Sequence, residues 1–182
     1  MLAIVRYSVV CLGLVLGACA APQQTATLTQ GQPGSLAASG RTAIIESAFT
    51  FAHRERLAGR PAEAARAIAQ VEFVAVDLAT NQAWTRLSPL AALNFQGARR
   101  EWRAALGIPE SAAPQAVIDA LIDTNMGLVN NDRGRAMASL PAAVFPLGGA
   151  ATLARLNALP ALPLTARATA FAQNEAARME GN

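Results

Sequence analysis

The sequence predicts an all-α domain, a small bundle of about five to seven helices after a disordered N-terminal tether. Alanine is abundant, apolar residues recur at helical spacing, and most prolines and glycines fall between the periodic stretches. No run of β-branched residues with period-two alternation is long enough to predict a strand. Without the first 40 residues, about 140 remain, which is the usual size of one domain.

The N-terminus has the layout of a secretory signal peptide. Arg6 is the only charge before an apolar run from Val9 to Leu16, and this run is too short for a bilayer, which needs about 20 apolar residues. The next residues, Leu16-Gly17-Ala18-Cys19, resemble the lipobox of bacterial lipoprotein precursors. The resemblance implies cleavage after residue 18 and a diacylglycerol on the thiol of Cys19. The alternative is an ordinary secretory peptide, cut at the small residues around Cys19.

The resemblance also implies a location and a membrane partner. Ala20 stands where aspartate favours retention in the inner membrane, so the implied location is the outer membrane, facing the periplasm. Residues 20–40 carry no charge and no aromatic side chain, which is typical of a flexible tether. We therefore expect a signal peptide at 1–18, a lipidated cysteine and tether at 19–40, and a helical domain at 41–182.

Two helices are predicted before residue 80. The first runs from about Arg41 to Ala58, and its inward face is expected to hold Ile45, Phe49 and Ala52, with Ile44, Ala48 and Phe51 beside them. The second runs from about Pro61 to Ala79, because proline is tolerated in a first turn. Its solvated face is expected to hold Glu63, Arg66, Gln70 and Asp77.

Glu72 lies on the opposite, apolar side of this second helix, among Ile68, Val71, Ala75 and Val76. A carboxylate at such a position is paired with an arginine, neutral through desolvation, or at the edge of the bundle. The functional interpretation is a general acid or ligand-binding group with a raised pKa. The structural interpretation is a buried carboxylate with a partner.

The third helix is predicted from about Pro89 to Leu106, and two of its polar residues are further candidates for burial. Its outward face is expected to hold Gln96, Arg99, Arg100 and Arg103, and its inward face Ala91, Phe95, Ala98, Trp102 and Ala105. Asn94 and Glu101 fall inside the margin of the apolar arc. They join Glu72 as candidate buried polar groups.

The remaining helices are shorter and separated by prolines. A fourth is expected from about Ser111 to Val129, followed by helices near 133–139, 149–158 and 165–179. The apolar stretch from Leu153 to Leu164 either packs across the bundle or forms an exposed patch for a partner or membrane surface.

The sequence lacks the residues that several kinds of metal, catalytic and phosphate-binding site require. His53 is the sole histidine and no glutamate precedes it by three residues, so no metal site of the Glu-x-x-His type is predicted. A Ser–His–acid set has no supporting motif, and there is no lysine for a phosphate loop. We therefore predict no catalytic residue, no metal and no cofactor. His53 itself is expected on a solvated face.

The charge balance argues against nucleic-acid binding. All 15 basic residues are arginines, and without Arg6 the chain carries 14 of them against 12 acids. Nucleic-acid proteins have denser and more one-sided basic patches. Arginines cluster locally only at Arg54, Arg56 and Arg60 and at Arg99, Arg100 and Arg103. Solvated helix faces are the expected explanation of both groups.

The sequence leaves three hypotheses for function. The first is a non-catalytic, lipid-anchored binding or scaffold module with an envelope protein as its partner. The second is a helical carrier of an apolar ligand in the periplasm, suggested by the apolar helices and the misplaced acids. The third is a hydrolase that uses Glu72 or Glu101.

Overall fold

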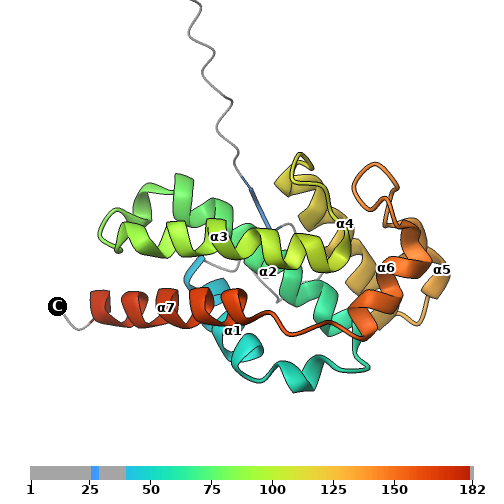
Figure 1. Cartoon of the computed structure of the whole chain (residues 1–182), viewed down its shortest axis with the longest axis horizontal. Coiled ribbons are helices and arrows are strands. Elements are labelled where there is room, and N and C mark those ends of the chain that lie inside the picture. The colour runs from blue at the N-terminus through green and yellow to red at the C-terminus, as the bar shows by residue number, and fades with distance from the viewer. Residues whose placement is uncertain (1–25, 29–39, 181–182) are drawn as a thin grey trace, which may run out of the picture.

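The computed structural model describes residues 26–28 and 40–180 of the chain (Figure 1). These residues form an all-α bundle, as predicted, with seven α-helices, two short 3-10 helices and no strand in the described ranges. The expected signal peptide, Cys19 and most of the expected tether lie outside these ranges. The predictions made for them therefore stay predictions.

The helix α2 (Pro61–Thr80) is the centre of the bundle. Of its 20 residues, 13 are buried, so it must be covered on several sides. Its neighbours are α1 (Gly40–Ala52), α3 (Pro89–Leu106), α4 (Pro114–Val129) and α6 (Gly148–Asn157). The apolar character that the sequence shows for this stretch is therefore explained by a central position.

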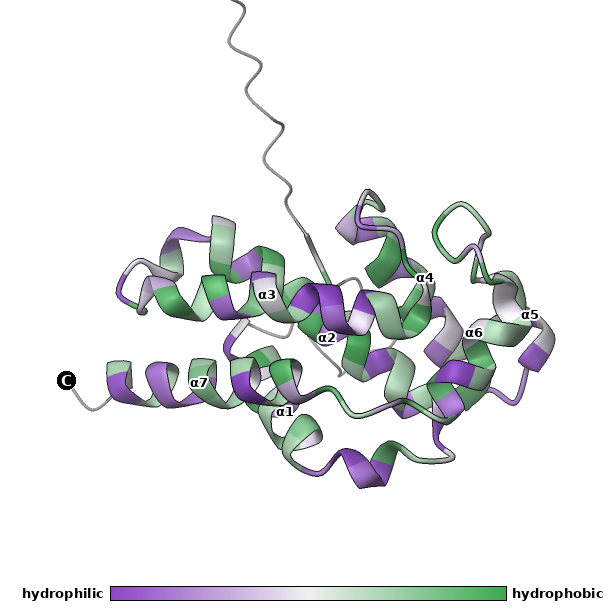
Figure 2. Ribbon diagram, in the orientation of Figure 1, coloured by the Kyte–Doolittle hydropathy of each residue, from purple (hydrophilic) through white to green (hydrophobic). Residues whose placement is uncertain are grey.

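The other elements close the bundle around α2. α7 (Pro163–Glu180) packs on α1 and α3, and α5 (Arg133–Ala138) packs between α4 and α6. In Figure 2, polar and apolar residues alternate along α7, as expected for an amphipathic helix at a surface. The 3-10 helices η1 (Arg54–Leu57) and η2 (Gln82–Trp84) lead into α2 and away from it.

Proline and glycine mark the helix ends. Pro61, Pro89 and Pro114 each stand in the first turn of a helix, where the missing N–H would have no intrahelical partner. Gly107 ends α3 with φ 72°, a left-handed conformation that side chains disfavour. A Cβ on Gly107 would also lie 2.6 Å from a methyl of Leu147, so two independent constraints select glycine there.

The first helix differs from its prediction in length and in orientation. α1 ends at Ala52, and a separate 3-10 helix follows it. Ile45 and Phe49, predicted to face inward, are 47% and 54% exposed, and Ala52 is exposed as well. The buried side chains are Ala43, Ile44, Ser47, Ala48 and Phe51. α1 has two adjacent apolar arcs, and α2 and α7 cover only one of them.

The C-terminal third agrees with the sequence. The three helices expected near 133–139, 149–158 and 165–179 are α5, α6 and α7. Leu153, Leu156 and Leu162 are buried, so the stretch from Leu153 to Leu164 packs across the bundle, while Leu164 itself stays 42% exposed. No helix in residues 26–28 and 40–180 combines the length and the apolar character needed to cross a membrane.

Candidate functional site

Glu72, the first buried polar group expected from the sequence, is fully buried between α2 and α3. Its Oε1 accepts hydrogen bonds from Arg99 Nε at 2.9 Å and Arg99 Nη2 at 2.6 Å. Its Oε2 accepts one from Trp102 Nε1 at 2.8 Å. Arg103, only 2% exposed, donates to both oxygens. Of the states considered for this carboxylate, pairing with arginine is the one that the structure confirms.

The environment of Glu72 keeps its carboxylate ionised. Burial by itself raises the pKa, but the hydrogen bond and charge of Arg103, followed by those of Arg99, outweigh burial and hold the pKa below its ordinary value. A group with a lowered pKa has no proton to give near neutral pH. Sealed under Trp102 and two arginines, Glu72 therefore lacks the properties of a general acid.

The prediction that Arg99 and Arg103 face solvent is wrong. Arg103 is buried, and the Arg99 side chain is only 17% exposed. Both turn toward Glu72, because a buried carboxylate must be paired to be tolerated. Arg103 Nη1 also donates to the carbonyl oxygens of Pro109, Glu110 and Ala112, each within 3.0 Å. The cluster thereby fixes the loop between α3 and α4.

Glu101 and Asn94, the other two candidates for burial, have different positions. Glu101 is partly buried and accepts hydrogen bonds from Leu164 N at 3.1 Å and from Thr165 N and Oγ1 at 2.8 and 2.7 Å. It therefore caps the start of α7, where a helix has unpaired N–H groups. Asn94 is exposed, so the prediction that it is buried is wrong. The buried arc of α3 is therefore narrower than the arc predicted from the sequence.

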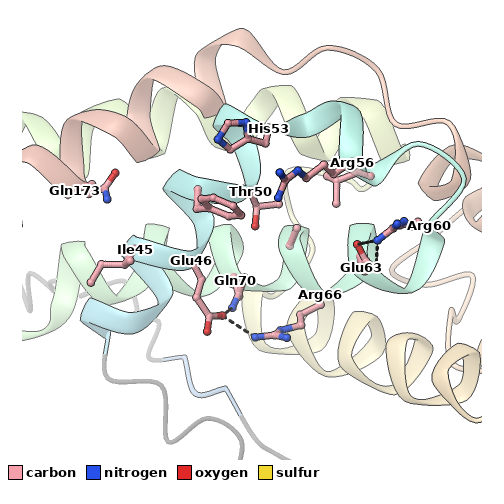
Figure 3. A pocket seen from close by; sticks show the side chains of 13 residues that line it. Ile45, Glu46, Thr50, His53, Arg56, Arg60, Glu63, Arg66, Gln70 and Gln173 are labelled. Atoms are coloured by element: carbon pink, nitrogen blue, oxygen red, sulfur yellow. Dashed lines mark hydrogen bonds and ion pairs between the residues drawn. The ribbon is translucent and has the colours of Figure 1, made fainter.

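A cleft of about 650 Å³ lies between α1, η1 and the first half of α2, and it is the candidate functional site (Figure 3). The wall from α1 and η1 consists of Ile45, Glu46, Phe49, Thr50, His53, Arg56 and Leu57. The opposite wall consists of Arg60, Glu63, Arg66, Ala67 and Gln70, with Gln173 of α7 at one end. Its volume falls in the range of small-ligand pockets, about 300–1,000 Å³.

Two acids in the cleft already have cationic partners. Glu46 accepts a hydrogen bond from Arg66 Nη2 at 2.7 Å and one from Gln70 Nε2, and Glu63 accepts one from Arg60 Nη1 at 3.0 Å. Three residues of the arc of α2 that was expected to be solvated, Glu63, Arg66 and Gln70, thus line one wall of the cleft. Gln70 is only 3% exposed, so its assignment to the solvated face is wrong, because Glu46 of α1 covers it.

The wall of the cleft that α1 and η1 form holds the exposed ring of Phe49 between the side chains of His53 and Arg56. The Phe49 ring lies 4.9 Å from that of His53, and the Arg56 guanidinium carbon lies 5.4 Å from the Phe49 ring centre. This second distance is that of a cation–π contact. The His53 side chain is 47% exposed, which confirms its predicted solvated position.

Among the described residues that line the cleft, Arg56 is the cation without an acidic partner. Arg60 and Arg66 are paired with Glu63 and Glu46, whereas no carboxylate of residues 26–28 and 40–180 forms an ion pair with Arg56. The cleft therefore offers an apolar face beside an uncompensated positive charge. Such a surface suits a ligand that has an apolar group next to an anion.

The remaining side chains of the cleft include the only histidine of the sequence. The acidic partner of His53 is Glu55, with 3.7 Å between Nδ1 and Oε1, and both side chains of this contact are exposed. Where the structure describes the chain, no three histidine, cysteine, aspartate or glutamate side chains lie together in a way that could hold a metal ion. Comparisons of the chain with protein-family models, with curated proteins and with solved structures find no match.

The sequence did not identify the cleft. Arg56 and Arg60 were expected on a solvated helix face, and Phe49 was expected in the core. One sequence signal was available, since His53 and three arginines gather between residues 53 and 60 next to two phenylalanines. Which of the two phenylalanines stays exposed depends on how α1 packs, and this is a property of the tertiary structure.

Proposed function

We propose that the chain is a lipid-anchored, non-catalytic binding module of the cell envelope, and that the cleft between α1, η1 and α2 binds its protein partner. The anchor rests on the resemblance of Leu16-Gly17-Ala18-Cys19 to a lipobox. The observation that carries the binding role is the exposed Phe49 ring beneath an arginine with no acidic partner in the described residues.

The chemistry of the cleft indicates what the partner presents. Three arginines and two glutamates line it, and both glutamates are paired. The remaining charge on Arg56 complements a carboxylate, and Ile45 and Phe49 complement an apolar side chain. The proposed partner segment therefore carries an acidic residue close to an aromatic or aliphatic one.

The positions of Glu72 and Glu101 do not support the hydrolase hypothesis. Glu72 is sealed and ionised, and Glu101 caps α7. The carrier hypothesis keeps one supporting observation, because the apolar wall of the cleft has room for a small apolar molecule. Extraction of the purified protein with organic solvent, followed by mass spectrometry, distinguishes a carrier, which releases a bound apolar molecule, from a protein-binding module, which does not.

The anchor is tested by intact-mass analysis of the membrane fraction, with wild type compared with Cys19→Ser. We expect the wild-type chain to begin at residue 19 with a diacylglyceryl mass, and the variant to lack it. A wild-type chain cut elsewhere and free of lipid would contradict the anchor.

The cleft is tested by placing a photoreactive phenylalanine analogue at Ile45 in living cells, with the same analogue at Leu93 as control. Both positions are exposed, but Leu93 lies on α3 away from the cleft. We expect a discrete crosslinked protein from position 45 and none from 93. Adding Arg56→Glu should abolish this product, because it reverses the charge proposed to hold the partner's acid. A product that survives Arg56→Glu would contradict the proposed chemistry.

A further inference from the structure

The segment Ala26–Leu28 lies against α4, although it belongs to the expected flexible tether. Thr27 N donates to Gln115 Oε1 at 2.7 Å, and Gln115 Nε2 donates to Thr27 O at 3.0 Å. The side-chain amide of Gln115 thus pairs with the backbone of Thr27 in the way that neighbouring strands pair. The side chain of Gln115 thus satisfies both the backbone N–H and the backbone carbonyl of Thr27.

The docking contact has two further supports. Gln115 Nε2 also donates to Asp119 Oδ1 at 2.7 Å, one helical turn along α4, and this fixes the orientation of the amide. Ala26 and Leu28, on either side of Thr27, are partly buried and pack against the core of the bundle. The contact therefore combines directional hydrogen bonds with buried apolar surface.

We propose that this docking sets which side of the domain faces the bilayer, with the start of α4 near the lipid surface and the cleft away from it. The inference rests on the proposed lipid anchor at Cys19. The partner in this proposal is the lipid surface itself. Gln115 is a positioning residue, because it holds the tether against the domain.

The length of chain between anchor and domain carries this proposal. Cys19 precedes Gly40 by 21 residues, and a chain of that length can extend to about 75 Å. Cys19 precedes Ala26 by only seven residues, which extend to at most about 25 Å. A domain of about 140 residues is roughly 40 Å across. With the tether docked, the far side of the domain is therefore beyond reach of the bilayer.

The η1 end of the cleft lies on that far side. The C-terminal part of α4 lies at the start of α2, where Asn125 Nδ2 donates to Ala62 O at 2.9 Å. Gln115 is ten residues earlier on the same helix, about 15 Å from that contact. In Figure 1 the docked segment (blue) lies above α2. The helix η1, which follows α1 and is coloured turquoise, lies below α2. The anchor would thus hold the domain with its cleft open to the periplasm.

Docking itself is tested without the lipid, on the chain from residue 19 carrying Cys19→Ser. We expect hydrogen exchange at the Thr27 amide to be about tenfold slower than in an unprotected segment, because opening must break its hydrogen bond. Gln115→Ala should remove this protection, while Gln82→Ala, a change at an exposed glutamine elsewhere in the domain, should leave it. Unprotected exchange in the parent chain would overturn the proposal.

Orientation is tested on the lipidated protein in vesicles. Lipidation blocks Cys19, and Cys11 leaves with the signal peptide, so one introduced cysteine can be labelled uniquely. Ala113→Cys marks the start of α4, and Ala58→Cys marks the end of η1; both positions are exposed. With an acceptor dye on the lipid headgroups, we expect greater energy transfer from position 113 than from 58. Gln115→Ala should erase this difference.

The outcomes separate the anchor from the orientation. If no lipidated chain is recovered, the proposed anchor fails, whereas the exchange measurement still decides whether the tether docks. If the lipidated chain shows equal transfer from positions 113 and 58, the orientation is overturned and the anchor stands. Protected exchange together with unequal transfer that depends on Gln115 would support the proposal.

Discussion

The two sides of α2 each hold a carboxylate paired with arginine, and only one of these sites is closed. On the α3 side, Glu72 is fully buried beneath Trp102, with Arg103 buried beside it. On the α1 side, Glu46 and Arg66 retain side-chain exposures of 35% and 42%. Trp102 and the α3–α4 loop close the first site, while an exposed Phe49 and open space border the second.

The difference shows that burial decides what an acid–arginine pair does. A pair removed from water must be complete, because an uncompensated buried charge is expensive. A pair that water still reaches contributes little to stability, so its residues can exchange partners when a ligand arrives. The Glu72 cluster therefore maintains the fold, and the Glu46 side of the helix is available for binding.

Glu72→Gln should produce the largest loss of stability among the substitutions of polar groups. It leaves Arg103 buried beside a neutral amide, and breaking a buried ion pair lowers the free energy of unfolding by about 3–5 kcal/mol. Urea denaturation followed by circular dichroism measures the change. The matched control is Glu46→Gln on the open side, for which we expect less than about 1 kcal/mol. Equal effects of the two substitutions would remove the distinction between the sites.

The pH dependence of stability should distinguish the same two sites. The folded-state pKa of Glu72 lies below its ordinary value because of Arg103 and Arg99, so the unfolded chain binds its proton more tightly. The stabilisation is present above the ordinary glutamate pKa of 4.5 and is lost as the pH falls toward the folded-state pKa. Stability should therefore fall more steeply on acidification in wild type than in Glu72→Gln. Parallel curves would show that Glu72 is not preferentially ionised by folding.

Glu101→Ala should have an intermediate effect on the α3 side. Removing this side chain leaves the N–H groups of Leu164 and Thr165 without their acceptor, and loss of a helix cap lowers stability by about 1–2 kcal/mol. Asn94→Ala is the matched control, because Asn94 lies on the same helix and is exposed. It should change stability by no more than about 0.5 kcal/mol. Thermal or urea unfolding of both variants measures the difference.

The fold could be predicted from the sequence because helical periodicity, proline in first turns and glycine at helix ends act locally. The same patterns located Glu72 and Glu101 as acids that need partners. They could not supply the partners, since Arg99 and Arg103 lie about 30 residues from Glu72 in the sequence, and a helical wheel alone places both arginines outside. Tertiary pairing turned them inward.

The cleft was beyond sequence analysis for a related reason. Two apolar arcs of α1 fit the helical spacing equally well, one through Ile44 and Phe51 and one through Ile45 and Phe49. Packing against α2 and α7 covers the first, and Gln70 of α2 is then covered by Glu46. Periodicity measures how apolar residues are spaced, whereas the choice between two arcs depends on neighbours far along the chain.

The smallest effect on stability is expected at the exposed arc of α1, which runs through Ile45 and Phe49. The contrast between the two phenylalanines of α1 is the sharpest test of how this helix packs. Phe49 is 54% exposed and Phe51 is 3% exposed on the same helix. Phe51→Ala should lower the free energy of unfolding by about 3–5 kcal/mol, because it opens a cavity in the core. Phe49→Ala should change it by no more than about 0.5 kcal/mol.

The same Phe49→Ala variant should nevertheless lose the crosslinked product formed at position 45, since it removes the apolar surface beneath Arg56. Unchanged folding together with lost crosslinking would show that an aromatic ring is kept on this surface for a partner. Large destabilisation by Phe49→Ala would instead place that ring in the core and leave the cleft without its apolar wall.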